Sequence, residues 1–277
     1  MSFGPHGFFP RGGGRANVTC DTLPIGVALR PLVAMRRGRV VSVEVVARIG
    51  GRFPGRVAEQ AMRGAESAAR RMVHLGGPAL AGDGHDDDAD ADAPCSPGGA
   101  SGTGAADDRL RAAEWSTIEG GALHCSVSVS GRVDRTGDSL SSGCVISAVA
   151  TTSEGWVLAH SVVLEGGGGG RKKIQKKKKT SKTPEQCGEE AVALLRAELE
   201  SGACLDEHAT DQVLLFAALA AGETVLRVRN LSLHATTALE LLRRLLGSEH
   251  TVEPVEGRLD AVILKVRGVG LVRGAGV

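Results

Sequence analysis

The stretch from Leu205 to Gly247 constrains the fold more than any other part of the chain, because two helix signals in it flank one strand signal. Thr210 and Asp211 belong to the residue types that cap helix N-termini, and an apolar block follows them at 213–220. Gly222 suits the left-handed conformation in which many helices end. The sequence therefore predicts a helix that begins near residue 210 and is terminated by Gly222.

The rest of this stretch predicts a strand followed by a second helix. Residues 224–231 alternate between apolar and charged side chains, as a half-buried strand does. The next helix has Thr236 or Thr237 as its cap and Gly247 as its end. Its expected buried stripe consists of four leucines, Leu239, Leu242, Leu245 and Leu246.

His234 lies in the short link between that strand and the second helix. Because the strand runs back beside the first helix, we expect it to return His234 to the end at which Asp211 lies. A helix N-terminus binds phosphate and keeps a nearby imidazole neutral, and a neutral imidazole is a competent nucleophile or base near pH 7. A solvated loop histidine explains the same position, so the residue pattern alone leaves both interpretations open.

Three separated parts of the chain resemble one protein family, in the order in which that family carries them. They are HGFFPRGGG at 6–14, the pair DEHATDQ at 206–212 and LSLHATT at 231–237, and the last strand and tail at 263–270. Together they are similar to the signature segments of the RNA 3'-terminal phosphate cyclases. Matches at three places are far more specific than a single glycine motif.

The resemblance implies a fold and a domain organisation. The expected class is α+β, with a split cyclase body of repeated α/β units and an inserted smaller α/β domain of thioredoxin-like topology. Residues 1–25 and 204–277 would form part of the body and carry the catalytic histidine, and residues 26–203 would form the insert domain. Two low-complexity insertions, at 78–108 and 166–182, interrupt that domain and are expected to be disordered.

Within 26–203 the residue patterns themselves predict a compact α+β unit. Its order is a strand at 39–49, a helix at 56–75, three more strands and a closing helix. The three strands are expected at 123–130, 144–151 and 156–164. The closing helix starts from a Thr-Pro-Glu-Gln capping box at 183–186 and ends at Gly202.

The resemblance also implies the chemistry. In the cyclases a histidine, here His234, attacks the α-phosphate of ATP to form a covalent histidyl-AMP, while Mg²⁺ or Mn²⁺ neutralises phosphate charge. The AMP then passes to an RNA 3'-phosphate, and the adjacent 2'-hydroxyl closes a 2',3'-cyclic phosphate. Asp211 and Gln212 match the family's Asp-Gln element and are expected at the nucleotide. His208 stands where relatives commonly carry tyrosine against the adenine face, and an imidazole stacks there less extensively.

The two insertions contain charge runs that have more than one interpretation. An acidic run at 86–92 adjoins His85, which either binds a divalent ion weakly or belongs to a solvated linker. The Lys-rich run at 171–179 is a nuclear import signal, a contact to RNA phosphate or a solvated loop. We expect a location in the nucleoplasm, with the cytoplasm as the alternative.

Composition limits the partners. A net charge of +1 argues against a nucleic-acid-binding field over the whole surface, so a contact to RNA must be local. The six cysteines show no CxxC pair and no zinc spacing, and no secretory signal is recognisable, so reduced thiols in an intracellular protein are expected. No apolar run reaches the ~20 residues that cross a bilayer, so no membrane partner is expected. The oligomeric state has no signal in the sequence.

One family element has no counterpart here. The acidic, glycine-rich segment DG-x-x-GEGGGQ of the cyclases is not matched, so we expect the chain to be a truncated gene product or a fragment of a longer protein. Two other interpretations stay open. One is a non-catalytic cyclase-like protein of ribosomal RNA processing, a class that lacks the nucleophilic histidine. The other is an RNA- or protein-binding module whose basic loop binds while His234 is inert.

Overall fold

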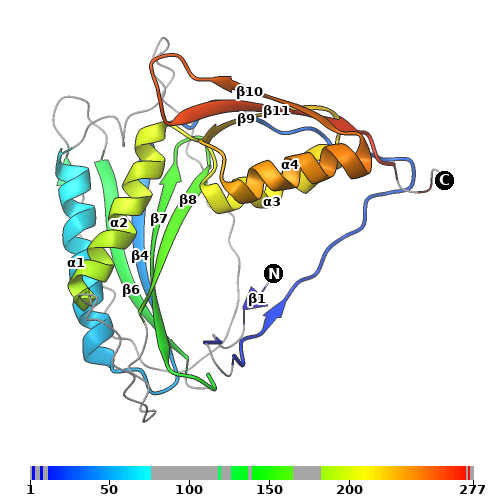
Figure 1. Ribbon diagram of the computed structural model, residues 1–277. Helices are drawn as coiled ribbons and strands as arrows, with labels where there is room; N and C mark the ends of the chain where they lie inside the picture. The colour runs from blue at the N-terminus through cyan, green and yellow to red at the C-terminus, as the bar shows by residue number, and fades with distance from the viewer. Residues whose placement is uncertain are drawn as a thin grey trace, which may run out of the picture.

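The computed structural model describes residues 2–3, 7–8, 12–75, 118–119, 126–136, 139–164, 182–272 and 274. Within these ranges it contains two mixed sheets, four helices and a short ribbon of β1 (Ser2–Phe3) and β2 (Ala16–Asn17). Figure 1 shows that helices cover one face of each of these sheets. The predicted α+β class is confirmed.

The larger sheet has five strands in the order β5-β6-β4-β7-β8. They are β4 (Val40–Gly50), β5 (Ile118–Glu119), β6 (Ser126–Thr136), β7 (Gly143–Thr152) and β8 (Val157–Leu164). Helix α1 (Gly55–Leu75) connects β4 to its parallel neighbour β6, whereas β7 and β8 form an antiparallel hairpin. Helix α2 (Pro184–Ser201) packs beside α1 and against β7 and β8. The predicted order of strand, helix, strands and helix is confirmed, with β5 as an additional short strand.

Both ends of α2 follow the predicted capping pattern. Thr183 Oγ1 accepts a hydrogen bond from the Gln186 amide (3.2 Å), and the Gln186 side chain accepts one from the Thr183 amide (2.9 Å). Gly202 ends the helix with a φ of 72°.

In β4 a register shift between residues 40 and 42 buries Val40 and leaves Val41 half-buried, because a bulge reverses the alternation of faces.

The smaller sheet has four strands in the order β10-β11-β9-β3. They are β3 (Val33–Ala34), β9 (Ala221–Arg229), β10 (Glu249–Pro254) and β11 (Ala261–Val269). Helices α3 (Glu207–Leu219) and α4 (Leu233–Leu246) pack on one face, over the fully buried pair Leu226 and Leu264. Trp156, at the turn of the β7–β8 hairpin, packs against both hydrophobic cores. The two units therefore share an apolar contact.

Helix α3 begins earlier and ends earlier than the sequence predicted. Its N-cap is Asp206, so the prediction of a cap at Thr210 or Asp211 was wrong. The helix ends at Ala220, and Gly222 lies inside β9 with a φ of 119°. The earlier aspartate is a sufficient cap, and a helix that starts there gains one further turn of backbone hydrogen bonds.

Helix α4 also begins one turn earlier than predicted. Ser232 is its cap, and Thr236 and Thr237 lie inside the helix, where their hydroxyls donate to carbonyl oxygens four residues back. The helix ends at its predicted glycine, which has a φ of 74°. The predicted leucine stripe is only partly buried, because Leu239 is buried whereas Leu245 is 77% exposed.

Strand β3 lies inside the range 26–203 that was assigned to the insert domain, yet it belongs to the smaller sheet. It pairs in parallel with β9, and the Leu32 amide beside it donates to Thr224 Oγ1 (3.2 Å). The chain therefore passes from the smaller sheet to the larger one only after β3. The division into 1–25 with 204–277 and 26–203 stays a prediction.

The structure tests the expectations for the cysteines and for membrane-spanning helices among the described residues, but it does not describe the charge runs of the two insertions. The insertion at 78–108 with His85 and the Lys-rich run at 171–179 lie outside it. The cysteines that the structure describes, Cys20, Cys144, Cys187 and Cys204, are free thiols. None of the described helices has both the length and the hydrophobicity that a bilayer crossing requires.

Helices α1 and α2 approach closely at Gly64 and Gly188. A Cβ added at Gly188 would overlap the carbonyl oxygen of Ala61, and one at Gly64 would overlap that of Glu185. We therefore expect Gly188→Ala to lower the free energy of unfolding by about 1–3 kcal/mol through overpacking, although alanine is the better helix former. Urea unfolding of the variant and the wild type measures this difference.

The matched control is Ala193→Gly at an exposed position of the same helix. It should lose about 1 kcal/mol through helix propensity alone. A Gly188→Ala protein that is more stable than the wild type would contradict the close packing of the two helices.

Candidate functional site

Two helix N-termini meet at one end of the smaller sheet (Figure 1). Strand β9 begins at the C-terminal end of α3 and runs back to the N-terminal end of that helix, as the sequence predicted. Ser232 Oγ donates a hydrogen bond to Asp211 Oδ1 (2.9 Å) and accepts one from the Ala235 amide (3.0 Å). Asp211 on α3 therefore holds the residue that caps α4.

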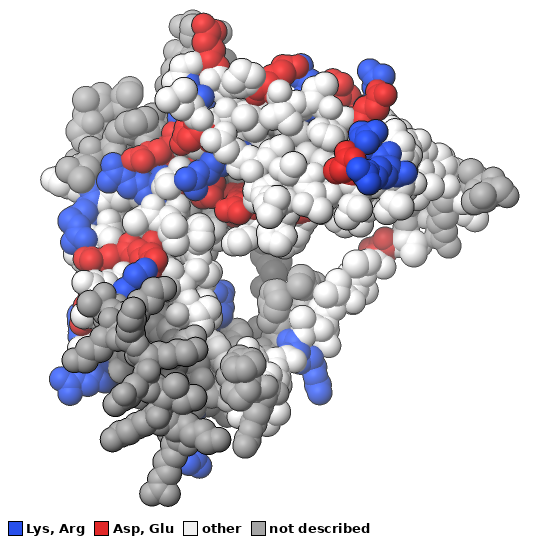
Figure 2. Space-filling model, in the orientation of Figure 1, with Lys and Arg blue, Asp and Glu red and all other residues white. Residues whose placement is uncertain are grey.

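A small depression lies between the starts of these helices. It is lined by Glu207, Thr210, Asp211, Arg229, Asn230, Leu231 and Ser232. Of the lining side chains, Arg229 is the basic one, and Glu207 and Asp211 are acidic. Figure 2 shows acidic and basic side chains interleaved with uncharged surface on the face that carries α3 and α4. The depression therefore offers charges of both signs close to two helix N-termini.

The predicted site residues His234, His208 and Gln212 all lie on these two helices. His234 is the second residue of α4, not part of a link, and its side chain is exposed. It occupies the first turn, where the free amides of a helix carry partial positive charge. His208 and Gln212 are exposed on α3 and lie four residues apart, which puts them on one side of that helix. These three residues do not line the depression, whereas Asp211 does.

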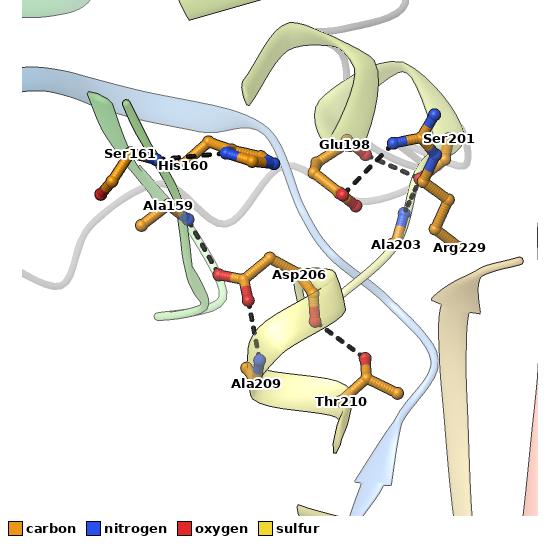
Figure 3. A network of polar contacts seen from close by, with 10 residues as sticks. All are labelled: Ala159, His160, Ser161, Glu198, Ser201, Ala203, Asp206, Ala209, Thr210 and Arg229. Atoms are coloured by element: carbon orange, nitrogen blue, oxygen red, sulfur yellow. Dashed lines mark hydrogen bonds and ion pairs between the residues drawn. The ribbon is translucent and has the colours of Figure 1, made fainter. Parts of the chain in front are cut away.

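Asp206 joins the start of α3 to the edge of the larger sheet, as Figure 3 shows. Its Oδ1 accepts a hydrogen bond from the Ala209 amide (2.8 Å), and its Oδ2 accepts one from the Ala159 amide of β8 (2.9 Å). The residue is 8% exposed. Sequence reasoning missed this role, although an aspartate followed by a glutamate is a signal of a helix start.

A second contact between the two units joins His160 of β8 to His208 of α3. The ring centroids are 5.8 Å apart, in an edge-on arrangement. Burial lowers the pKa of His160, and the neighbouring His208 lowers it further, while Asp206 and Glu207 act in the opposite direction. His160 is therefore neutral near pH 7, and the ring at the predicted adenine position rests against a residue of the other sheet.

Glu198 of α2 and Arg229 at the end of β9 form a third contact between the units (Figure 3). Arg229 Nη1 donates to Glu198 Oε1 at 3.3 Å. Glu198 is fully buried, and its Oε2 has no hydrogen-bond partner in the part of the chain that the structure describes. Burial raises the pKa of this carboxyl group, whereas Arg229 lowers it. Sequence reasoning missed the pair, and its only local signal is a glutamate on the apolar face of a helix.

The described residues contain no group of three or more His, Cys, Asp or Glu side chains arranged to hold a metal ion. Glu207 and Asp211 nevertheless place two carboxylates along one depression. Mg²⁺ is commonly bound by one or two carboxylates together with substrate phosphates and water. These residues therefore fit a divalent cation that arrives with a phosphate ligand.

The raised pKa of Glu198 makes stability depend on pH. Its unfolded reference value is 4.5, and the folded protein keeps the proton to a higher pH. The stability that the neutral carboxyl contributes is present below pH 4.5 and is lost as pH rises through the folded pKa. We therefore expect Glu198→Gln to equal the wild type in unfolding free energy near pH 4.5 and to exceed it near pH 7. Urea unfolding across this range measures the difference, and a variant that is less stable at neutral pH would show that the ion pair outweighs desolvation.

Comparisons with known proteins give a consistent result. A family model described as RNA 3'-terminal phosphate cyclase matches residues 1–252. An RNA 3'-terminal phosphate cyclase of Nitrosospira multiformis is 50% identical over 62 residues, which cover 22% of this chain and 18% of that protein. One from Hyperthermus butylicus is 38% identical over 91 residues, which cover 32% of this chain and 25% of that protein. A probable RNA 3'-terminal phosphate cyclase of Dictyostelium discoideum is 32% identical over 71 residues, which cover 26% of this chain and 16% of that protein.

The aligned segments thus span between 16% and 25% of the length of these relatives. The family model covers far more of this chain than the pairwise alignments do, since its match extends from residue 1 to residue 252. The chain therefore belongs to the RNA 3'-terminal phosphate cyclase family.

Proposed function

We propose that the protein is an ATP-dependent RNA 3'-terminal phosphate cyclase with His234 as its nucleophile. Family membership supports the reaction class. The observation that carries the proposal is the position of His234, exposed in the first turn of a helix whose cap is held by Asp211. A histidine there meets its substrate among free helix amides, which attract phosphate.

The first step forms a bond between an imidazole nitrogen of His234 and the α-phosphorus of ATP, while the bond to pyrophosphate breaks. The attacking imidazole nitrogen supplies the electron pair of the new bond. Asp211 acts on this step through Ser232, because the hydrogen bond between them fixes the start of the helix that carries His234. Asp211 is thus a positioning residue for the nucleophile and, from its place in the depression, also a nucleotide contact.

The later steps consume the covalent adenylate. An oxygen of the RNA 3'-phosphate attacks the phosphorus of histidyl-AMP, and His234 leaves with its electron pair. The neighbouring ribose 2'-hydroxyl then attacks the activated 3'-phosphate, loses its proton and displaces AMP. The product is a 2',3'-cyclic phosphate.

The remaining contacts of the nucleotide come from α3. We assign His208 to the adenine face and Gln212, one turn further along the helix, to the nucleotide edge. Glu207 and Asp211 would hold Mg²⁺ or Mn²⁺, which neutralises the negative charge of the phosphates. We propose the nucleoplasm as the site of action, on the basis of the Lys-rich run at 171–179.

Labelling of the protein tests the nucleophile. We expect ATP labelled at the α-phosphate, with Mg²⁺ or Mn²⁺, to leave acid-labile and base-stable label on the wild type. His234→Ala should reduce this label at least about 100-fold, because the attacking nitrogen is gone. His74→Ala, which removes an exposed histidine at the end of α1, is the matched control and should label normally. A folded wild type that is labelled only when a complete N-terminal cyclase body is supplied would indicate a fragment of a cyclase, and absence of label in both cases would favour the non-catalytic cyclase-like alternative.

The adenine contact can be tested by restoring the family's usual residue. His208→Tyr presents a larger ring, so we expect the KM for ATP to fall several-fold with little change in kcat. His250→Tyr on β10 makes the same exchange away from the proposed site and should leave both constants unchanged. A rise in KM with His208→Tyr would argue against a stacking role at this position.

A further inference from the structure

Glu198 occupies a position that a purely structural residue would not need. It is fully buried among the apolar residues of α2, and Oε2 lacks a hydrogen-bond partner among the described residues. A buried carboxylate with an unpaired oxygen costs stability, and uncharged replacements of buried ion pairs are often neutral or stabilising. The fold of the α1–α2 layer therefore gives no reason for a charge at this point.

The partner of Glu198 lies at the depression. Arg229 ends β9 and lines the depression, and its side chain is 38% exposed although Nη1 contacts the fully buried Glu198. A guanidinium has five N–H donors in a fixed planar fork. The contact through Nη1 orients this fork without occupying all of it.

We propose that Arg229 binds a phosphate group of the substrate in the depression, and that Glu198 is the positioning residue that aims the guanidinium there. This inference rests on the proposed function for the identity of the substrate. To the proposed function it adds a residue that binds phosphate, Arg229, and a residue of the larger unit, Glu198, that positions it. The pair crosses from α2 to β9, so the larger unit would contribute directly to substrate binding.

The charges around the depression favour a phosphate over other ligands. Arg229 is the basic side chain among the lining residues, and Thr210, Asn230 and Ser232 add short polar groups. Arginine recognises phosphate through two parallel hydrogen bonds, which a fork held by a carboxylate is preorganised to make. Glu207 and Asp211 line the same space and would repel a bare anion, so binding should require a divalent cation.

Two substrates carry the required chemistry, the triphosphate of ATP and the 3'-phosphate of RNA. Binding is therefore measured by calorimetry on the full chain with His234→Ala as the parent, which separates binding from nucleotidyl transfer. The ligands are ATP with Mg²⁺, an RNA oligonucleotide that ends in a 3'-phosphate, and the same oligonucleotide with a 3'-hydroxyl. The variants added to the parent are Glu198→Gln and Arg229→Lys.

We expect each variant to raise the dissociation constant of one phosphate ligand about tenfold or more, which is the usual effect of losing a hydrogen bond between charged groups. The ligand whose dissociation constant rises identifies the source of the phosphate. The dissociation constant of the 3'-hydroxyl oligonucleotide should not change. The melting temperature of Glu198→Gln should equal or exceed that of the parent. A merely structural Glu198 would lower the melting temperature and leave the dissociation constants unchanged.

Glu253→Gln is the matched control, because Glu253 pairs with Lys265 on an exposed part of the same sheet. It should change no dissociation constant. Unchanged binding in Glu198→Gln and Arg229→Lys, or a parent that binds neither phosphate ligand, would overturn the inference. Loss of binding in these variants together with an unlabelled wild type would overturn the proposed nucleophile but not the phosphate site.

Discussion

The carboxylate of Asp206 is the interaction on which the arrangement of the two units depends. One oxygen caps α3, and the other accepts the outward amide of Ala159 on the edge strand β8. An edge strand leaves such amides without partners in its own sheet, so this bond both satisfies the strand and fixes where the helix begins. The start of α3 in turn positions Asp211, which holds Ser232 at the start of α4. The position of His234 is thus set from the larger sheet through two carboxylates.

This arrangement explains why acidic residues gather beside the N-termini of α3 and α4. Helix N-termini carry partial positive charge, so Asp206, Glu207 and Asp211 are favourable there one by one. Together they repel one another, and Arg229 supplies the opposing charge on the side of β9. Asp206 and Glu207 also act on Glu198 and His160, and both acids raise the pKa of each of these groups. The junction is therefore a coupled set of charges and not a row of separate surface residues.

The sequence predicted the parts of the fold that local patterns encode. Periodic apolar residues located β4, α1 and α2, and the capping box at Thr183 gave the start of α2 within one residue. Strand β10 was not anticipated, because nearly all of its residues are exposed and it has no alternating apolar face. The contacts of Asp206 with Ala159 and of Glu198 with Arg229 join residues 47 and 31 positions apart. No periodicity or cap signal reports such contacts, so the polar junction beside the predicted site could not be foreseen.

The location of this junction supports a functional role on grounds separate from family membership. Folded proteins satisfy nearly all buried polar groups, and an exception needs a local reason. Here Glu198, whose Oε2 has no hydrogen-bond partner among the described residues, contacts Arg229 of the depression, and the partly buried His160 contacts His208 in the first turn of α3. The cores under α1 and under α4 consist mainly of aliphatic side chains and could be packed without either group. A costly buried carboxylate that contacts a residue lining a depression is typical of a site in which orientation matters more than stability.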